Sequence, residues 1–487
     1  MVYKHGVYSS EIPTSIIPPV KTSAGLPVVF GTAPVHLATN PMPANKPVLC
    51  YSYAEAVAAF GYSADWEKYT LCEFIYSHFS LFNVAPIVLI NVLDATVHKT
   101  AVTDKAMTIE GGTAIIKGEP VMLDTLVVKL VSAGQPLVKG TDYVAGYNDD
   151  LNVVITPVQG GAVLTGQTSL VISYTKLNPE AVNSDDIVGG IDVTTGETEG
   201  LELVSKIYPL FRLVPGQILA PGWSGDPVVA AVMHAKARNI NGVFQATAIA
   251  DIPTTGTAAV KQYTQAPAWK NTNNYVDEQL IVCWPKVSLG GKQFHLSTQL
   301  AGICCQTDAA NDDIPYVSPS NKSLQANAAI TAEGKEIYLD LSQANYLNGE
   351  GIVTALNFIG GWKAWGNRTG AYPGITDIKD TYIPVRRMFN WIANTLILTH
   401  WQKIDGPITR RFVESLVDSA NIWLNGLAAR EMILGGRVAF LEEENPTTDL
   451  LNGVFRLHYY VAPPAPAENI EEVIEYDTSY FKSLFGE

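Results

Sequence analysis

Short apolar runs alternate with segments of helical periodicity through much of this 487-residue chain. Runs that are rich in branched residues and too short for helices predict buried strands. These runs lie at 26–31, 46–50, 85–92, 217–221, 243–249 and 280–284. Apolar residues spaced by three or four predict helices at 53–60, 71–82, 227–238 and 294–308. This alternation predicts an α/β fold in which helices flank a mixed sheet.

A different pattern fills residues 94–186. There the β-branched runs are short, and Gly, Asn and Asp turns separate them. The expected strands lie at 113–116, 126–131, 141–143, 153–155 and 170–174. Because the α/β pattern continues on both sides, we expect an all-β, sandwich-like domain inserted into the α/β domain.

The last third of the chain is the most helical. Long helices are expected at 385–401 and 408–430, and the second should bury one apolar face. The residues of that face are Phe412, Leu416, Ala420, Trp423 and Leu427. A hairpin is expected from 437–442 and 454–461, whereas the segment 308–361 offers one strand candidate, at 336–341.

Both ends of the chain alternate apolar and polar residues close to prolines. We expect extended, strand-like N- and C-terminal arms, because proline cannot donate to a strand ladder and separates these runs from the body. Such arms can add to the sheet edge of a neighbouring copy by main-chain hydrogen bonds. The candidate subunit-linking residues are Val7, Tyr8, Ile12, Ile470, Val473, Ile474 and Tyr476.

These patterns divide the chain into five parts, and its length agrees with about three folded domains. The parts are an N-terminal arm (1–22), a discontinuous α/β core (23–93 and 187–375), a peripheral β insertion (94–186), a C-terminal α/β domain (376–465) and a C-terminal arm (466–487).

Composition narrows the classes of function. Only 16% of the residues are charged, against about 25% in typical globular proteins, as is often found in subunits of large assemblies. Taken alone, the composition favours a mildly acidic, soluble enzyme over such a subunit. The net charge of −15 argues against DNA or RNA as a partner, because nucleic-acid binding depends on clustered Lys and Arg.

The sequence also bears on the compartment. The first residues lack an apolar export segment, and no run of about 18 uncharged apolar residues occurs, so we expect neither export by the usual route nor membrane insertion. The five cysteines are an odd number without paired spacing, which predicts free, buried thiols in a reducing cytoplasm.

Candidate chemistry is sparse. Ser224 lies at a strand-to-helix turn, but Asp226 stands where a nucleophile elbow needs Gly, so we expect Asp226 to cap a helix instead. The adjacent Cys304 and Cys305 lack metal-ligand spacing, and the Gly pairs at 189–190 and 360–361 lack a phosphate-binding context. We therefore expect no catalytic residue, no cofactor and no metal site.

The segment 361–369 is the most distinctive of the chain, since it packs two indoles and two cations into nine residues. In an enzyme, Arg368 would bind an anion. In a structural protein, Trp362 and Trp365 would anchor a loop that Arg368 holds by forked hydrogen bonds.

Five segments of this chain resemble motifs of the tail sheath proteins of contractile phages and R-type bacteriocins. Residues 5–12 resemble an "HGV…EI" arm, 45–49 an "NKPVL" strand and 218–222 an "ILxxPG" turn. The most specific match is Trp365, Gly366, Asn367, Arg368 and Thr369, which resembles "FWGNRT". Residues 405–409 resemble a "DKPIT" helix start, although Gly406 stands where Lys is common.

The resemblance covers nearly the whole chain outside the β insertion. It implies a structural, non-enzymatic subunit that forms stacked hexameric rings around an inner tube and contracts to drive the tube through a cell envelope. It also implies partners, namely further copies, the tail tube protein, the baseplate and the tail terminator. The implied location is a virion tail or bacteriocin particle, assembled in the cytoplasm of a bacterial host.

In relatives of this kind the C-terminal structure lines the inner wall. The charged face of the expected helix 408–430 is therefore a candidate for contact with the tube, through Arg410, Arg411 and Glu414. A solvated helix face is the simpler alternative. For the whole chain, the alternatives are another tail structural protein, of the tube or baseplate, and an α/β hydrolase-like enzyme.

Overall fold

The computed structural model describes the backbone of residues 20–21 and all atoms of residues 24–163 and 166–485. The chain divides into two compact units, Met1–Gly406 and Pro407–Glu487. The expected boundary at 376 falls within the first unit. The N-terminal arm residues Val7, Tyr8 and Ile12 lie outside the described residues.

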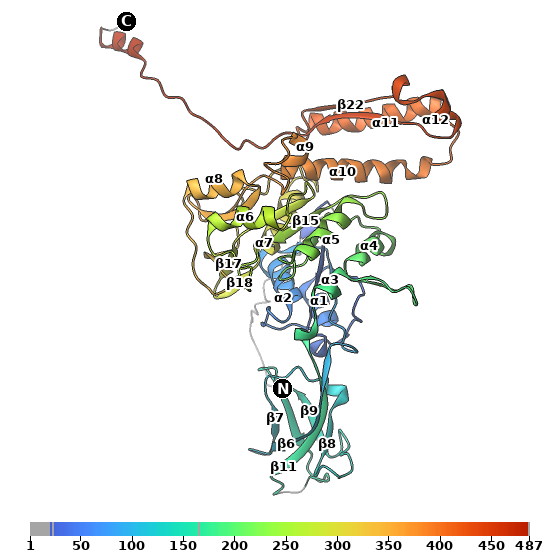
Figure 1. Cartoon of the computed structure of the whole chain (residues 1–487), viewed down its shortest axis with the longest axis vertical. Coiled ribbons are helices and arrows are strands. Elements are labelled where there is room, and N and C mark those ends of the chain that lie inside the picture. Colours follow the sequence, from blue (N-terminus) through green and yellow to red (C-terminus); the bar gives the residue numbers. More distant parts are fainter. Residues whose placement is uncertain (1–19, 22–23, 164–165, 486–487) are drawn as a thin grey trace, which may run out of the picture. The chain divides into compact units, whose positions relative to one another are not determined.

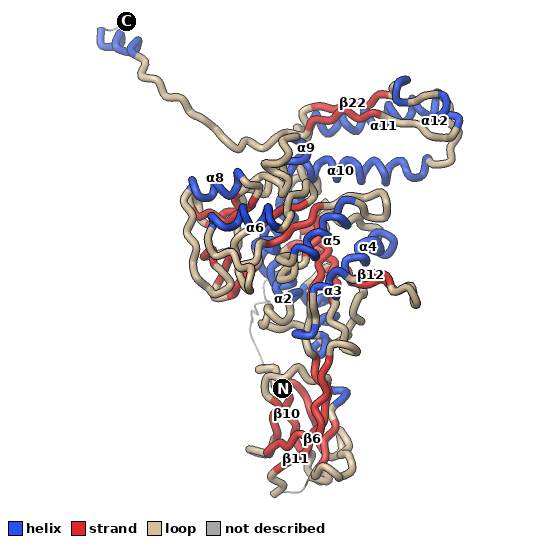
Figure 2. Tube along the Cα trace, in the orientation of Figure 1, coloured by secondary structure: helices blue, strands red, loops and turns tan. Residues whose placement is uncertain are grey.

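The first unit is organised around one large sheet (Figures 1 and 2). Within the described residues eight strands form it, and the inner six run parallel while the two edge strands run antiparallel to their neighbours. In spatial order they are β21 (Trp362–Trp365), β20 (Ile352–Asn357), β16 (Leu280–Cys283), β15 (Thr247–Asp251), β14 (Gln217–Leu219), β2 (Pro27–Gly31), β5 (Ile87–Asn91) and β3 (Val48–Cys50). The predicted mixed sheet of an α/β fold is confirmed.

Helices pack around this sheet, and the most strongly periodic ones match their predicted ranges. They are α1 (Tyr53–Phe60), α2 (Thr70–Ile75) with its π-helical continuation η2 (Tyr76–Phe82), α3 (Ser184–Val188), α4 (Val204–Phe211), α5 (Pro227–Arg238), α6 (Ala266–Thr272), α7 (Leu296–Ala309), α8 (Leu341–Gly349), α9 (Ile378–Thr381) and α10 (Ile383–His400). Helix α7 is buried along most of its length, which explains why its sequence shows little polar face.

Two strand predictions are wrong in detail. The segment 336–341 is not a strand, because the Asp340 side chain accepts a hydrogen bond from Gln343 N and starts helix α8. The run 243–249 becomes strand only from Thr247, since Asn241 and Gly242 adopt positive φ and turn the chain between Ile240 and Phe244.

The inserted β domain is confirmed, and over its described residues it holds two antiparallel sheets of three strands each. One sheet has the order β7 (Ala114–Ile116), β10 (Val153–Pro157) and β9 (Tyr143–Tyr147). The other has the order β6 (Lys99–Thr108), β11 (Ser169–Leu177) and β8 (Val127–Lys129). The domain has a hydrophobic core of eleven buried residues, which is separate from the main core and includes Ile116, Val128 and Ile155.

The insertion enters and leaves the α/β domain side by side. Lys99 at the start of β6 pairs with Leu177 at the end of β11, and Asn178 N donates to His98 O. The two connecting chains are therefore adjacent, as a peripheral inserted domain requires.

Smaller elements complete the first unit. They are the sheet β18 (Lys292–Phe294), β17 (Lys286–Leu289) and β19 (Ala328–Ile330), the hairpin β12 (Gly190–Ile191) and β13 (Thr198–Glu199), and the parallel pair β1 (Val20–Lys21) and β4 (Val84–Ala85). None of the helices in the described part of the chain combines the length and the hydropathy that a membrane-spanning helix requires.

The second unit contains one long helix and a hairpin. Its elements are α11 (Arg410–Ala429), β22 (Gly435–Ala439), α12 (Thr447–Leu451), β23 (His458–Ala462) and the 3-10 helix η9 (Thr478–Phe485). Strand β22 pairs antiparallel with β23, so the predicted hairpin is confirmed.

The buried face of α11 is rotated from the predicted one. The predicted Leu416, Ala420 and Leu427 are buried, but Phe412 and Trp423 are only half-buried, and Val413 and Leu424 take their places in the buried stripe. That stripe consists of Val413, Leu416, Ala420, Leu424 and Leu427. Both sets have helical spacing, so the sequence pattern alone could not choose between two overlapping stripes.

Candidate functional site

The distinctive Trp365–Thr369 segment lies where edge strand β21 ends. Gly366 follows with a φ of +140°, and a Cβ atom there would lie 2.8 Å from Asn348 Nδ2. That same amide nitrogen donates to the carbonyl oxygens of Ile352 and Trp365, at 2.9 Å each. Asn348 therefore bridges the neighbouring strands β20 and β21 at a point where only glycine leaves room for it.

Asn367 connects this loop to helix α10. Its side-chain Oδ1 accepts a hydrogen bond from the Ser318 hydroxyl, and its carbonyl accepts one from Ile383 N at 2.8 Å. Gly366 N donates to Ser320 Oγ at 3.0 Å. The loop is thus held from both sides, by segment 318–320 and by the first residue of α10.

Arg368 is clamped between α9 and two tyrosines. Its Nη1 donates to Thr381 Oγ1 at 3.3 Å, and its Nη2 donates to Tyr382 OH at 2.9 Å. The guanidinium carbon lies 3.8 Å from the ring centre of Tyr382 and 4.4 Å from that of Tyr372. Forked hydrogen bonds and ring stacking together hold Arg368 against α9 and the two tyrosines.

Thr369 completes the brace. Its backbone nitrogen donates to Thr381 O at 2.8 Å, and its hydroxyl donates to Asp380 O at 2.6 Å. The next residue, Gly370, donates to Leu280 O at 2.7 Å. The motif therefore connects the central sheet to α9 and α10, which is a structural role.

A buried ion pair reinforces the connection and has no signal in the sequence. Arg387 of α10 places Nη1 3.0 Å from Asp308 Oδ1 of α7, and its Nη2 contacts Oδ2. Burial raises the pKa of Asp308 above its usual value, although the neighbouring guanidinium opposes that rise. The two residues lie far apart in the chain, so no local pattern could have paired them.

Ser224 and Asp226, at the strand-to-helix turn, have structural roles. Ser224 is buried, and its Oγ accepts a hydrogen bond from Asp251 N at 3.1 Å. Asp226 accepts from Val228 N at 2.9 Å, so its predicted capping of α5 is confirmed. The serine hydroxyl therefore supports the turn between β14 and α5.

Two buried carboxylates hold the start of α7. Glu73 accepts hydrogen bonds from His295 N and approaches His295 Nδ1, at 2.7 Å each. Asp251 accepts from Ser297 N at 2.9 Å. Burial raises the pKa of Glu73, but the charge and the hydrogen bonds of His295 lower it by more, so the pKa lies below its usual value. Anions at a helix N-terminus are stabilised by its dipole and its free N–H groups.

The cysteines are buried and unpaired, as predicted. Burial raises the pKa of Cys304 to about 11 and that of Cys72 to about 12, so these thiols stay protonated at neutral pH. Across the described residues, no cluster of three His, Cys, Asp or Glu side chains has the geometry to hold a metal ion.

The charged residues proposed for tube contact lie at the start of α11. Thr409 caps this helix by accepting a hydrogen bond from Phe412 N. Arg410 and Arg411 are exposed, and Arg410 Nε lies 2.7 Å from Glu414 Oε1. All three side chains are exposed, so contact with the tube stays a prediction.

The C-terminal arm residues leave the second unit as extended chain. Residues 463–477 form no helix or strand, and the side chains of Val473 and Ile474 are 86% and 91% exposed. Ile470 and Tyr476 are also largely exposed. The expected strand at 470–476 is therefore absent from the single chain, whose apolar side chains lie open to a partner.

The sequence of this chain is similar to those of known tail sheath proteins. The chain is 27% identical over 492 residues to the tail sheath protein of Burkholderia phage BcepMu, and the match covers 99% of both chains. It is 26% identical over 235 residues to the major tail sheath protein of Serratia phage KSP20, which covers 46% of this chain and 56% of that protein. No protein-family model matches the chain.

Solved structures agree on the fold. The sheath complex of the extracellular contractile injection system PVC, in its contracted state, aligns with a TM-score of 0.55 over 99% of both chains at 14% identity. The contracted helical sheath of the anti-feeding prophage aligns with a TM-score of 0.55 over 97% of this chain and 99% of that one, at 15% identity. The fold is therefore that of the sheaths of contractile injection systems. The chain is thus similar, over nearly its whole length, to a phage tail sheath protein.

Proposed function

We propose that the chain is the repeating subunit of a contractile tail sheath. Copies polymerise as stacked hexameric rings around an inner tube, and contraction drives the tube through the envelope of the target cell. The observation that supports this most directly is the match to a phage tail sheath protein over 99% of both chains. A protein of this class is structural and catalyses no reaction. Electron microscopy of the purified protein tests the proposal, because sheath subunits should form hollow, striated cylinders.

The terminal arms are proposed to link the subunits. The exposed alternating run around Val473 offers main-chain donors and acceptors, and in the described part of the second unit β22 and β23 pair only with each other. The outer edge of β23 is therefore open to a strand from another copy, whereas the Asn421 side chain already bonds the backbone of Val438 on the outer edge of β22. The N-terminal residues Val7, Tyr8 and Ile12 are proposed as a second linking strand.

Linkage through arms suits a contracting assembly. A subunit whose body is braced internally by Arg368 and by the Arg387–Asp308 pair can rotate as a rigid body while the arms keep neighbours connected. An extended state held behind a barrier can then convert to a wider, shorter one without a bound nucleotide.

Two further roles are proposed for particular regions. The exposed face of α11 with Arg410, Arg411 and Glu414 meets the tail tube protein. The inserted β domain is peripheral, because it has its own core and is joined to the body by adjacent chains at Lys99 and Leu177. Other proposed partners are the baseplate and the tail terminator, and the proposed location is a virion or bacteriocin tail assembled in the host cytoplasm.

A further inference from the structure

The last described residues of the chain form an apolar plug. The 3-10 helix Thr478–Phe485 exposes four large apolar side chains, and Phe485 is 85% exposed. The four are Tyr480, Phe481, Leu484 and Phe485. Such a cluster on a soluble chain marks an interaction site, because exposing apolar surface to water is unfavourable.

The plug can reach well beyond its own unit. Residues 463–477 connect it to β23 as extended chain (Figure 2), and at about 3.3 Å per residue they span up to roughly 50 Å. The plug is separate from the strand-like run 470–476, which precedes it. The two segments can therefore make different contacts in an assembly.

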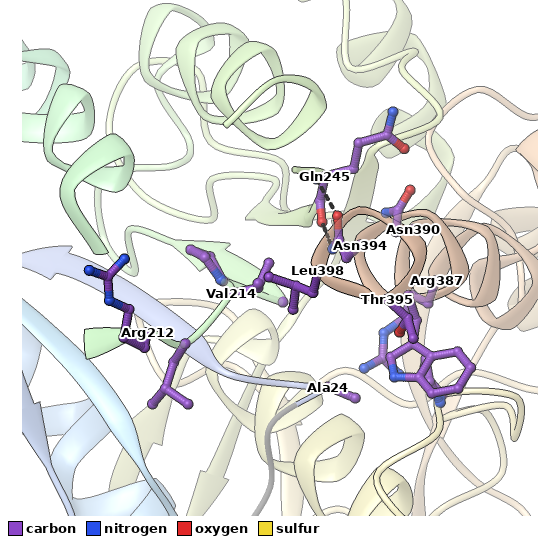
Figure 3. A pocket seen from close by; sticks show the side chains of 14 residues that line it. Ala24, Arg212, Val214, Gln245, Arg387, Asn390, Asn394, Thr395 and Leu398 are labelled. Carbon is purple, nitrogen blue, oxygen red and sulfur yellow. Dashed lines mark hydrogen bonds between the residues drawn. The ribbon is translucent and has the colours of Figure 1, made fainter. Parts of the chain in front are cut away.

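A cavity beside α10 in the first unit can hold an aromatic side chain. It has a volume of about 220 Å³ and lies between α10 and the loop 212–216 (Figure 3). An apolar cavity of about 150 Å³ is enough to bind benzene, so one aromatic ring of the plug fits. Its apolar lining residues are Ala24, Leu213, Val214, Pro215, Pro315, Trp391 and Leu398.

Three of the polar side chains around this cavity are already engaged. Asn394 exchanges two hydrogen bonds with the backbone of Gln245, at 2.9 and 2.7 Å (Figure 3). Asn390 exchanges two with Gln279, and Arg387 is paired with Asp308. An aromatic ring entering the cavity would therefore leave none of these groups without a partner.

Other large cavities of the first unit suit an apolar guest less well. One cavity, of about 650 Å³, is lined by charged groups that include Glu67, Lys286 and Lys292. Another, of about 390 Å³, is lined by Lys68, Glu119 and Lys176 among others. An aromatic ring placed there would strip water from charges without replacing it.

We propose that the plug 478–485 of one copy inserts an aromatic side chain into the α10 cavity of another copy. Arg212 at the cavity rim offers a guanidinium that can stack on a second ring of the plug. The inference rests on the proposed sheath assembly. It adds a side-chain anchor to the main-chain linkage of residues 470–476.

Disulfide trapping between two singly substituted chains tests the contact. Phe481→Cys protein is mixed with Leu398→Cys protein, assembled and mildly oxidised, and linked dimers are then sought on a non-reducing gel. The background is low because all five native cysteines are buried. We expect linked dimers in this mixture and far fewer when Tyr338→Cys, an exposed position elsewhere in the first unit, replaces Leu398→Cys.

Substitution gives an independent measurement. Phe481→Asp with Phe485→Asp should raise the critical concentration for assembly at least about tenfold, as loss of an anchor residue does, and leave the thermal melt unchanged. Ile359→Asp, at the exposed tip between β20 and β21, is the matched control and should change neither.

The outcomes separate the plug from the assembly itself. Cylinders that form without linked dimers, or at an unchanged critical concentration in the double Asp variant, would overturn the plug and leave the sheath function standing. A disulfide within single chains of a Phe481→Cys, Leu398→Cys double variant would overturn docking between copies. Unsubstituted protein that forms no cylinders would overturn both.

Discussion

Arg387 of α10 and Asp308 of α7 form a bidentate ion pair that is almost wholly buried, with side chains 4% and 0% exposed. Replacing Arg387 with Met leaves Asp308 buried without a counter-ion. We expect a loss of about 3–5 kcal/mol in the free energy of unfolding, measured by denaturant titration. Replacing both residues, as Arg387→Met with Asp308→Leu, should recover much of that loss. A double variant as unstable as the single one would show that the pair contributes through packing and not through charge.

Gly366 provides a second test of the brace. Gly366→Ala should destabilise the first unit by about 1–3 kcal/mol, because it combines a strained φ with a Cβ that meets Asn348. Gly361→Ala is the control, since Gly361 also has a positive φ but its Cβ would meet nothing within 4 Å. Equal losses of unfolding free energy in the two variants would mean that the contact with Asn348 contributes nothing to the destabilisation.

The helices and parallel strands of the core could be predicted because their signals are local. Helix α5 has an Asp cap, Pro at its first turn and regular apolar spacing, and its predicted bounds are confirmed. Strand β21 was missed because a four-residue edge strand shows little periodicity. Strand β20 was missed too, since five of its six residues are buried and its sequence shows no alternation. Strand β6 was missed because most of its residues are exposed and polar.

The contacts within the brace could not be predicted. The motif at 365–369 stood out by composition, but its partners Asn348, Ser318 and Thr381 lie on other elements. Such partners follow from the tertiary fold, and a single sequence contains no signal for them. The same holds for the rotated face of α11, where two overlapping apolar stripes were available.

The C-terminal arm yields a prediction about assembly. Deleting residues 469–487 should leave a folded body, because the side chains of 469–485 are exposed, but one that no longer polymerises. Val473→Pro, which removes a backbone donor, should weaken assembly more than folding, and Val473→Ala is its control. Sedimentation measures assembly and circular dichroism measures folding. Long cylinders from the truncated chain would refute linkage by this arm.

The charged face of α11 yields a prediction about the tube. Exchanging Arg410 and Arg411 for Glu should hardly change the thermal melt, because both side chains are exposed and such charges each contribute about 0–1 kcal/mol. Repetition around the rings should nevertheless weaken co-assembly with the tube protein, more strongly at low salt. Exchanging Arg430 for Glu, at the other end of the helix, is a control. Unaltered co-assembly at low ionic strength would place the tube contact elsewhere.

The inserted β domain yields a prediction about shape. Replacing residues 99–177 with a short Gly/Ser linker should keep the protein soluble and folded, because the ends of the insertion pair with each other and its core is separate. Cylinders formed by this variant should have a thinner wall in electron micrographs. Insoluble protein would instead show that the insertion shares the main core.

Electron microscopy of the purified, unsubstituted protein shows whether its copies form a sheath. At concentrations that favour assembly, we expect hollow cylinders with transverse striations, and end-on views with six-fold rotational symmetry. Particles that remain single chains at every concentration, or filaments without a lumen, would contradict this expectation.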